Sequence, residues 1–204
     1  MELIEEKNSN IIKNNTNDIT EINNKSKCKD TQFFNYEDYN LNNNFKLWFH
    51  NANDKNWNIE SYNEIQNFDN IINILEFNNL LEKFPLFINN GMIFFMRENI
   101  KPIWEDENNI NGGCISWKIE KQDVLNTWIN LIELLISNEL NELDKFIING
   151  ISISPKRSNN ILKIWIGKQI SNEELKKINL GKHFTFDDNC RLFKSHQDNI
   201  KKDG

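Results

Sequence analysis

The sequence predicts an α+β domain in which helices cover one face of an antiparallel β-sheet. Segments with strand-like alternation are separated by tight turns in some places and by helical stretches in others, an order typical of this class. The chain has 204 residues, enough for one such domain and a tail. A sheet covered on one side leaves its other face open to a ligand.

Residues 1–44 are predicted to form a flexible, asparagine-rich tail. Their apolar residues are isolated and follow no sustained period. Such a segment cannot bury enough surface to offset the entropy lost on ordering. We therefore assign the folded domain to residues 45–204.

The first strand and the first helix follow from a change in apolar periodicity. FKLWFHN, residues 45–51, predicts a strand with two different faces. One face carries Phe45, Leu47 and Phe49, and the other carries Lys46, Trp48 and His50. A polar loop with Trp57 follows, and residues 59–66 predict a second strand. Residues 68–84 carry a helical stripe, with Asp69 as the expected N-cap.

The second half of the domain continues the mixture of strands and helices. Ser171 and Glu174 have the spacing of a capping box, and Gly181 is expected to end the short helix that they begin. The remaining predicted elements are strands at 91–97, 114–120, 150–154, 161–167 and 191–196 and a heavily buried helix at 122–137.

Charge and cysteine content limit the class of protein. The net charge is -6 and the isoelectric point is about 5.2, which argues against a general nucleic-acid coat protein. An anionic ligand must therefore meet a local basic cluster. Cys28, Cys114 and Cys190 are scattered, and we find neither a signal peptide nor an apolar run that could span a membrane. We expect a cytoplasmic protein without membrane attachment.

No set of catalytic or metal-binding residues is recognisable. His50, His183 and His196 are isolated, and neither metal-ligand spacing nor a glycine-rich phosphate loop occurs. A nucleophilic pair of Cys190 and His196 would need a spatial arrangement that the sequence does not indicate. We predict a protein that is not an enzyme and that needs no metal or cofactor.

The placement of tryptophan is the strongest functional signal. Trp57 and Trp104 lie in polar loops, and Trp104 is followed at once by Glu105, Asp106 and Glu107. A single tryptophan is more often structural than functional, but two loop tryptophans beside carboxylates can sandwich an electron-poor base and hydrogen-bond its edge. For Asp106 and Glu107 an ordinary acidic loop is the simpler interpretation.

Six motifs together resemble the eukaryotic translation initiation factor 4E family, whose members bind the cap of messenger RNA. The resemblance implies a curved antiparallel sheet of about eight strands, three helices on its convex face and a ligand slot on its concave face. It covers the chain from Phe45 to the C-terminus. The motifs are LWFH at 47–50, KNW at 55–57, PIWEDE at 102–107 with GG at 112–113, TWINLIELLI at 127–136, ILKIW at 161–165 and SH at 195–196.

The resemblance also implies roles for individual residues. Trp57 and Trp104 would stack on both faces of 7-methylguanine, Glu105 would accept hydrogen bonds from its edge, and Trp165 would contact the methyl group. Lys163 shares strand parity with Trp165 and should face the same side. The candidates for binding the triphosphate are Lys156, Arg157, Lys163, Lys201 and Lys202, with His196 at the rim of the pocket.

On the convex face, the family binds a scaffold factor of the 4G type and repressor proteins. This chain departs from the family there, because Leu75 replaces a tryptophan, Asn130 replaces an acidic residue and Glu133 replaces a leucine. These departures leave two alternatives for the convex face, a divergent 4G-like partner or no scaffold partner, and the protein itself is expected to be a monomer. The candidate groove residues are Ile71, Leu75, Trp128, Ile129 and Glu133.

Four interpretations remain open at this point. The first is a cap-binding protein that recruits capped messenger RNA for translation initiation. The second is a cap-binding repressor or sequestering protein that does not engage the usual scaffold, which Leu75 and Glu133 favour. The third is a protein-interaction module that has lost cap binding. The fourth is an enzyme that acts on the cap, against which the lack of a catalytic set argues.

Overall fold

The computed structural model describes residues 39–84, 88, 91–140, 148–176, 178–179 and 192–203. Most of the predicted tail, together with Gly181, His183 and Cys190, lies outside the described residues. The first strand begins at Asn40, so residues 40–44, which the sequence placed in the tail, belong to the sheet.

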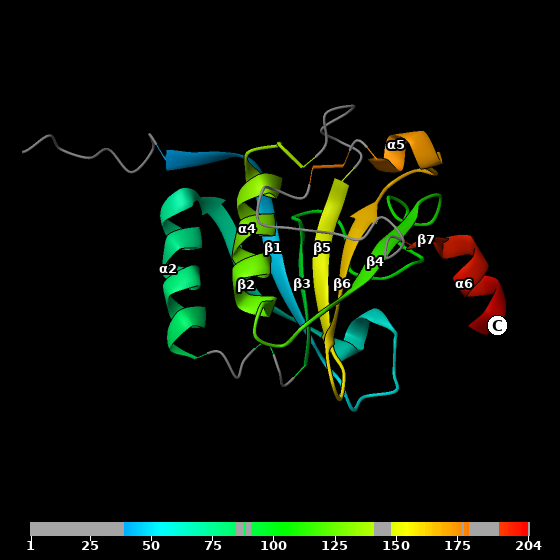
Figure 1. Ribbon diagram of the computed structural model, residues 1–204, viewed down its shortest axis with the longest axis horizontal. Coiled ribbons are helices and arrows are strands. Elements are labelled where there is room, and N and C mark those ends of the chain that lie inside the picture. Colours follow the sequence, from blue (N-terminus) through cyan, green and yellow to red (C-terminus); the bar gives the residue numbers. More distant parts are fainter. Residues whose placement is uncertain are drawn as a thin grey trace, which may run out of the picture. The chain divides into compact units, whose positions relative to one another are not determined.

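Seven strands form one antiparallel sheet with the order β2-β1-β3-β5-β6-β4-β7 (Figure 1). Within the described part of the chain this is one strand short of the family expectation of about eight. A 3-10 turn, Ile59–Ser61, occupies the start of the segment predicted as the second strand. The strands are β1 (Asn40–Asn51), β2 (Tyr62–Asn70), β3 (Gly91–Arg97), β4 (Gly113–Ile119), β5 (Ile148–Pro155), β6 (Asn160–Ile166) and β7 (Leu192–Ser195).

In the described part of the chain three helices pack on one face of this sheet, in agreement with the predicted three. Helices α2 (Ile71–Lys83) and α4 (Val124–Ile136) lie side by side over the strands (Figure 1). Helix α5 (Asn172–Lys176) adds Leu175 to the same core. A fourth helix, α6 (His196–Asp203), follows β7 directly and contacts the strands at that edge of the sheet.

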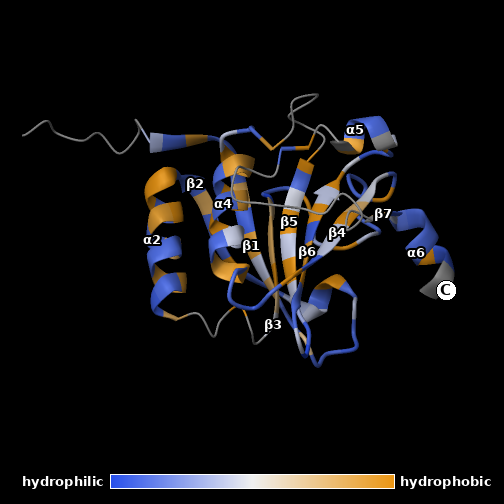
Figure 2. Cartoon of the chain, in the orientation of Figure 1, coloured by the Kyte–Doolittle hydropathy of each residue, from blue (hydrophilic) through white to orange (hydrophobic). Residues whose placement is uncertain are grey.

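The two faces of the sheet have separate apolar clusters, and β1 shows why. Phe45 and Leu47 point into the core under the helices and are buried, whereas Trp48 and His50 are buried on the opposite face. This confirms the alternation predicted for residues 45–51. Burying each large apolar side chain contributes about 1.5–3 kcal/mol. In Figure 2, α4 is largely hydrophobic and α6 is largely hydrophilic, in keeping with the packing of α4 on the core.

The start of α2 corrects one prediction. The N-cap is Asn70, whose side-chain oxygen accepts a hydrogen bond from the Ile72 backbone N–H at 2.8 Å. Asp69 lies one residue too early, because β2 continues through Asn70. The Asp69 carboxylate instead accepts a hydrogen bond from the Asn73 side chain. A cap must precede the first helical residue directly for its side chain to reach the second or third N–H of the helix.

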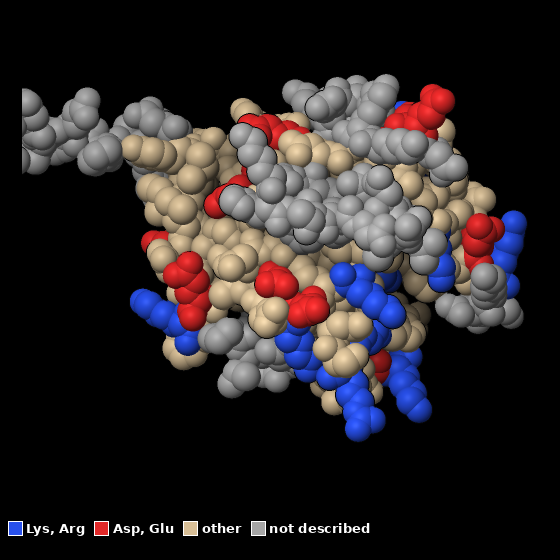
Figure 3. Space-filling model, in the orientation of Figure 1, with Lys and Arg blue, Asp and Glu red and all other residues tan. Residues whose placement is uncertain are grey.

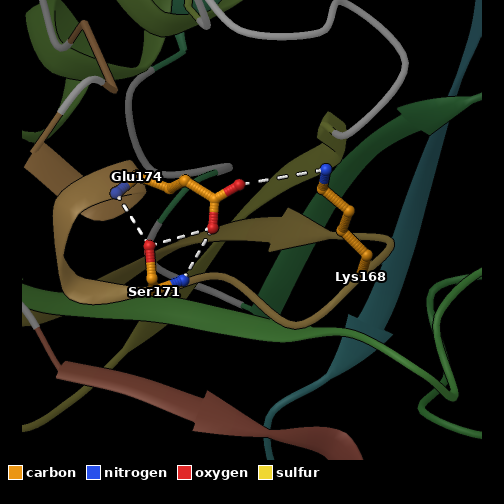
Figure 4. Close-up of polar contacts among 3 residues, drawn as sticks. All are labelled: Lys168, Ser171 and Glu174. Atoms are coloured by element: carbon orange, nitrogen blue, oxygen red, sulfur yellow. Dashed lines mark hydrogen bonds and ion pairs between the residues drawn. The ribbon is translucent and has the colours of Figure 1, made fainter.

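The capping box before α5 is confirmed (Figure 4). The Glu174 backbone N–H donates to Ser171 Oγ at 3.2 Å, and Glu174 Oε2 accepts from the Ser171 backbone N–H at 2.8 Å. Lys168 Nζ lies 4.0 Å from the other carboxylate oxygen of Glu174. These bonds satisfy two N–H groups that a helix start leaves unpaired.

Candidate ligand-binding site

A cavity of about 570 Å³ lies on the sheet face that the three helices leave uncovered. It brings together six residues that the sequence singled out, from the Trp57 loop, the Trp104 loop, the β5–β6 turn and strand β6. The lining consists of the predicted Trp57, Trp104, Glu105, Lys156, Lys163 and Trp165, together with Tyr62, Met92, Phe94, Pro102, Ile103, Ser152, Ser154, Ile161 and Ile200.

Strand register explains why the strand residues meet in this cavity. Phe94 of β3 is paired with Ser152 of β5, which is paired with Lys163 of β6. Paired residues of antiparallel strands point to the same face, and so do alternate residues of one strand, which adds Trp165. The predicted shared face of Lys163 and Trp165 is confirmed. The sequence reasoning missed Phe94 and Ser152, which become recognisable only when the pairing of strands distant in the chain is known.

The Trp104 loop is held by a buried asparagine. Asn109 Nδ2 donates to the backbone carbonyls of Lys101 and Ile103, each at 2.9 Å, and Asn109 Oδ1 accepts from Asn149 Nδ2 at 2.9 Å. Asn109 has no exposed surface. The loop is thereby tied both to itself and to the start of β5, which gives the Trp104 backbone a defined position at the cavity.

The two glycines that follow this loop are required by close backbone packing. A Cβ at Gly112 would lie 1.8 Å from the Ile166 carbonyl oxygen, and one at Gly113 would lie 2.3 Å from the Lys194 carbonyl oxygen. Both contacts are with backbone that belongs to the sheet. Any side chain at these positions would force the loop away from β6 and β7.

His196 supports Trp104 from behind. The two rings are stacked, with centroids 6.5 Å apart and planes inclined by 21°, and the His196 ring also lies 5.0 Å from the ring of Trp165. His196 is fully buried and does not line the cavity. The prediction that it lies at the pocket rim is therefore wrong, because its position as the first residue of α6 directs it under the Trp104 ring.

The hydrogen bonds of His196 determine its chemical state. A carbonyl can only accept a hydrogen bond, so His196 Nδ1 carries the proton and donates to the Asn109 carbonyl at 2.7 Å. In a neutral ring the other nitrogen, Nε2, is then unprotonated and accepts from the thiol of Cys114 at 3.2 Å. Burial lowers the pKa of His196, and the same cause raises the pKa of Cys114 to about 12. Both groups are neutral, unlike a catalytic thiolate–imidazolium pair. The Cys190 of the rejected pairing lies outside the described residues.

The Trp57 loop is held mainly by contacts between near neighbours in the chain. The side chains of Asn51, Asp54 and Asn56 each accept a hydrogen bond from the backbone N–H two residues on. Such Asx turns suit a loop rich in asparagine. Ser61 Oγ donates to the carbonyl of Asn56 at 2.7 Å and closes the loop onto the 3-10 turn.

His50 supports Trp57 as His196 supports Trp104. The rings of His50 and Trp57 are stacked at 4.6 Å with planes inclined by 12°, and His50 Nε2 donates to the Asn56 carbonyl at 2.8 Å. Trp57 is 52% exposed. One face of the indole is therefore covered by a buried histidine, and the other is left to the cavity.

The charged groups of the cavity have opposite signs at different places. Glu105 is exposed, lines the cavity and has no hydrogen-bond partner among the described residues. Burial and the negative charge of Glu105 raise the pKa of Tyr62. Lys156 in the β5–β6 turn and Lys163 on β6 provide positive charge. Asp106, by contrast, is engaged within the loop, where its carboxylate accepts from the backbone N–H groups of Lys101 and Asn108.

Several predicted residues are not part of the cavity. Arg157 is exposed in the β5–β6 turn and Lys201 is exposed on α6, but neither lines the cavity, and the side chain of Lys202 lies outside the described part. On the helical face, Trp128 has no exposed surface and cannot form part of an open groove. The other groove candidates reach the surface to different degrees: Leu75 is 54% exposed, Ile71 and Glu133 are exposed, and Ile129 is half-buried.

These features define a binding site for a flat aromatic ligand. Indole rings suit a planar ring system, a carboxylate without a partner suits an edge with N–H donors, and two ammonium groups suit an attached anion. Among the described residues no group of three or more metal-ligating side chains occurs, and no helix is long and apolar enough to cross a membrane. The class of protein that follows is a ligand-binding protein with an open sheet face.

The family model described as Eukaryotic initiation factor 4E matches residues 40–204, and the chain therefore belongs to this family. The family consists of translation initiation factors and not of enzymes, as the sequence predicted. Eukaryotic translation initiation factor 4E1 of Drosophila melanogaster is 29% identical over 179 residues, which are 80% of this chain and 65% of that protein. The Arabidopsis thaliana initiation factor NCBP is 31% identical over 75 residues, 36% of this chain and 32% of its own length.

Solved structures support the same fold. The complex of C. elegans eIF4E-3 with the 4E-binding protein Mextli and a cap analog has a TM-score of 0.70 at 19% identity, and the match covers 80% of this chain and 95% of that one. Ascaris suum eIF4E-3 in complex with the m7G cap has a TM-score of 0.60 at 21% identity, with 68% and 79% of the two chains covered. The predicted α+β fold and family are confirmed.

Proposed function

We propose that the protein binds the 7-methylguanosine cap of messenger RNA and recruits capped RNA for translation initiation in the cytoplasm. The observation that carries this proposal is that Trp57, Trp104 and Glu105 line one cavity. Family membership and the cap ligands in the structures of similar fold support it.

Stacking between the two indoles accounts for recognition of the methylated base. Methylation at N7 gives guanine a positive charge, which an aromatic face attracts by up to about 2 kcal/mol when water is excluded. This adds to ordinary base stacking of about 1–3 kcal/mol. Unmethylated guanine lacks the additional attraction, so the cavity discriminates between the two bases.

The remaining lining residues serve the edge, the methyl group and the phosphates. Glu105 accepts the hydrogen bonds of guanine N1–H and the exocyclic amine, each charge-assisted bond being worth about 1.5–3 kcal/mol. Trp165 closes the bottom of the slot against the methyl group. Lys156 and Lys163 attract the triphosphate, and Arg157, Lys201 and Lys202 are outer candidates for longer-range attraction.

Selective retention on immobilised 7-methyl-GTP tests the proposal. The protein should bind this resin and bind immobilised GTP only weakly, because only the methylated base is cationic. Equal retention on the two resins would refute cap recognition. Failure to bind either resin would favour the third interpretation, a module that has lost cap binding.

We further propose that a partner protein docks beside Leu75 on the outer face of α2. Leu75 and Ile71 are exposed apolar residues on successive turns of this helix, and C. elegans eIF4E-3, which has a similar fold, forms a complex with a 4E-binding protein. Because Trp128 is buried, replacing it would damage the core and is a poor probe. Leu75→Asp should instead abolish partner capture in a pull-down and leave 7-methyl-GTP binding intact.

The same pull-down distinguishes an initiation factor from a cap-binding repressor. Capture of a scaffold protein that assembles with ribosomal subunits supports recruitment. Cap binding together with capture of partners that include no such scaffold would instead favour the sequestering protein. A Leu75→Asp variant that keeps every partner of the wild type would contradict docking beside Leu75. Glu133→Gln serves as a control, since it changes a charge on α4 and not the apolar contact.

A further inference from the structure

A second hollow of about 670 Å³ lies where the end of β4 meets the β5–β6 turn. It is bounded by the end of β4 with the start of the β4–α4 connection on one side and by the β5–β6 turn on the other. Its polar and charged lining residues are Lys118, Lys121, Glu120, Gln122, Ser158 and Asn159.

The pairing of β4 with β6 connects this hollow to the cap cavity. Lys118 of β4 is paired with Ile161 of β6, and Ile161 lines the cap cavity. Two residues further along β6 lies Lys163, a distance of about 7 Å at the rise of a strand. Lys118 is thus the next basic residue on the same sheet face beyond Lys163.

The β5–β6 turn borders both hollows and is itself basic. Lys156 lines the cap cavity, Ser158 and Asn159 line the second hollow, and Arg157 lies between them in the chain. Figure 3 shows Lys and Arg side chains gathered at the end of the sheet where this hairpin turns. In a chain with net charge -6, such a concentration of positive charge indicates an anionic ligand.

The basic side chains of this region are available to a ligand. Ion pairs in the described part of the chain join Lys46 to Glu64 and Lys168 to Glu174, and none involves Lys118 or Lys121. Glu120 opposes an anion in the hollow, but its carboxylate accepts a hydrogen bond from Gln122 at 3.1 Å. The two lysines outnumber this one carboxylate.

We propose that the second hollow binds the sugar–phosphate backbone of the first nucleotides after the cap. This inference depends on the proposed cap function, because a capped RNA must leave the cavity on the triphosphate side, where Lys156 and Lys163 lie. The hollow has no aromatic lining residue on which a base could stack. The contact is therefore electrostatic, independent of nucleotide sequence and sensitive to salt.

Binding of 7-methyl-GTP and of a short capped oligouridine to the full chain, measured over roughly 50–200 mM salt, tests this proposal. Lys118→Gln/Lys121→Gln should leave 7-methyl-GTP affinity unchanged. For the capped RNA, the dependence of log K on log salt should become shallower by about 1.4, because each phosphate contact of a single strand contributes about 0.7. A capped oligoadenylate should show the same change.

Matched controls separate this site from a general effect of charge. The Lys83→Gln/Lys168→Gln double variant removes the same charge elsewhere and should not alter the slope. The Lys118→Arg/Lys121→Arg double variant keeps the charge and should keep the wild-type slope.

An unchanged slope in the Lys118→Gln/Lys121→Gln double variant, with normal 7-methyl-GTP binding, would overturn the RNA site alone. If an oligoglutamate of equal charge weakens capped RNA binding and, in a separate titration, binds to the hollow more tightly than uncapped oligouridine does, the hollow would be reassigned to an acidic protein segment. Absence of 7-methyl-GTP binding by the wild type would overturn the RNA site and the cap function together.

Discussion

The two tryptophan loops of the cavity are built in different ways. The Trp57 loop is stabilised by hydrogen bonds between residues two to six positions apart, and its indole is 52% exposed. The Trp104 loop is joined to residues 40 and 87 positions away in the chain, through Asn149 and His196, and Trp104 is half-buried.

This difference indicates a division of labour between the two sides of the slot. A loop joined to the core through buried hydrogen bonds keeps its ring in place before a ligand arrives, whereas a loop held by exposed local bonds opens at lower cost in free energy. We expect Trp104 to be the preformed wall and Trp57 to be the adaptable one. Each is supported from behind by a buried histidine, which limits how far either ring can retreat.

The largest expected effect separates the two loops by stability. Asn109→Ala removes the side-chain donor of the Lys101 and Ile103 carbonyls and the acceptor of one Asn149 bond, and should lower the free energy of unfolding by about 2–4 kcal/mol. Asn56→Ala in the Trp57 loop removes one exposed hydrogen bond and should cost about 0.5–1 kcal/mol. Urea denaturation measures both. Equal losses would show that the loops are equally coupled to the core.

Ligand affinity provides the second comparison. Trp104→Ala and Glu105→Ala should each weaken 7-methyl-GTP binding at least about tenfold, because each lost interaction exceeds about 1.4 kcal/mol. Trp57→Ala should weaken binding less. The stacking energy that is lost is offset in part, because the variant no longer loses the entropy of ordering the adaptable Trp57 loop when the ligand binds. Fluorescence titration with 7-methyl-GTP gives the three constants. A larger effect for Trp57 would reverse the assignment of the two walls.

The histidine behind Trp104 predicts a dependence of stability on pH. The unfolded chain binds a proton at His196 near the ordinary pKa of about 6.5, whereas burial keeps the folded His196 neutral at lower pH. The unfolded state then holds more protons, so the free energy of unfolding should fall as pH decreases below about 6.5, by at most about 1.4 kcal/mol per pH unit. Denaturant curves between about pH 5 and 7 should be less pH-dependent for His196→Gln. An identical dependence in this variant would contradict the assignment.

The smallest effect is expected at the histidine behind Trp57. His50 Nδ1 is buried and has no hydrogen-bond partner in the described structure, so His50→Phe removes an unfavourable group while keeping a ring behind Trp57. The lost bond to Asn56 is tolerable because Ser61 also donates to that carbonyl. The change in unfolding free energy should stay within about 1 kcal/mol, and cap affinity within about threefold. A large loss of affinity would give the imidazole a specific role.

Local patterns predicted most of the fold and the centre of the site. The alternation at 45–51 assigned the two faces of β1, and the capping box marked the start of α5. Trp57, Trp104 and Glu105 were identified because tryptophan is unusual in polar loops and because their motifs resemble one family. Errors in the fold lay mainly at boundaries, as at Asn40 and Asn70, where a strand extends beyond its apolar pattern. Errors in the site concerned long-range placement, as for His196, which is buried and does not lie at the rim of the cavity.

What the sequence by itself determined is therefore the set of elements, their faces and the chemical types of the ligand-binding residues, since these depend on spacings of two to four residues. Only the tertiary structure decided that His196 lies beneath Trp104, that Trp128 is buried and that Lys118 continues the basic surface beyond Lys163. The physical reason is that such contacts join distant segments, as Cys114 and His196 do across 82 positions. No local pattern records which strands become neighbours, because that choice minimises the free energy of the whole core.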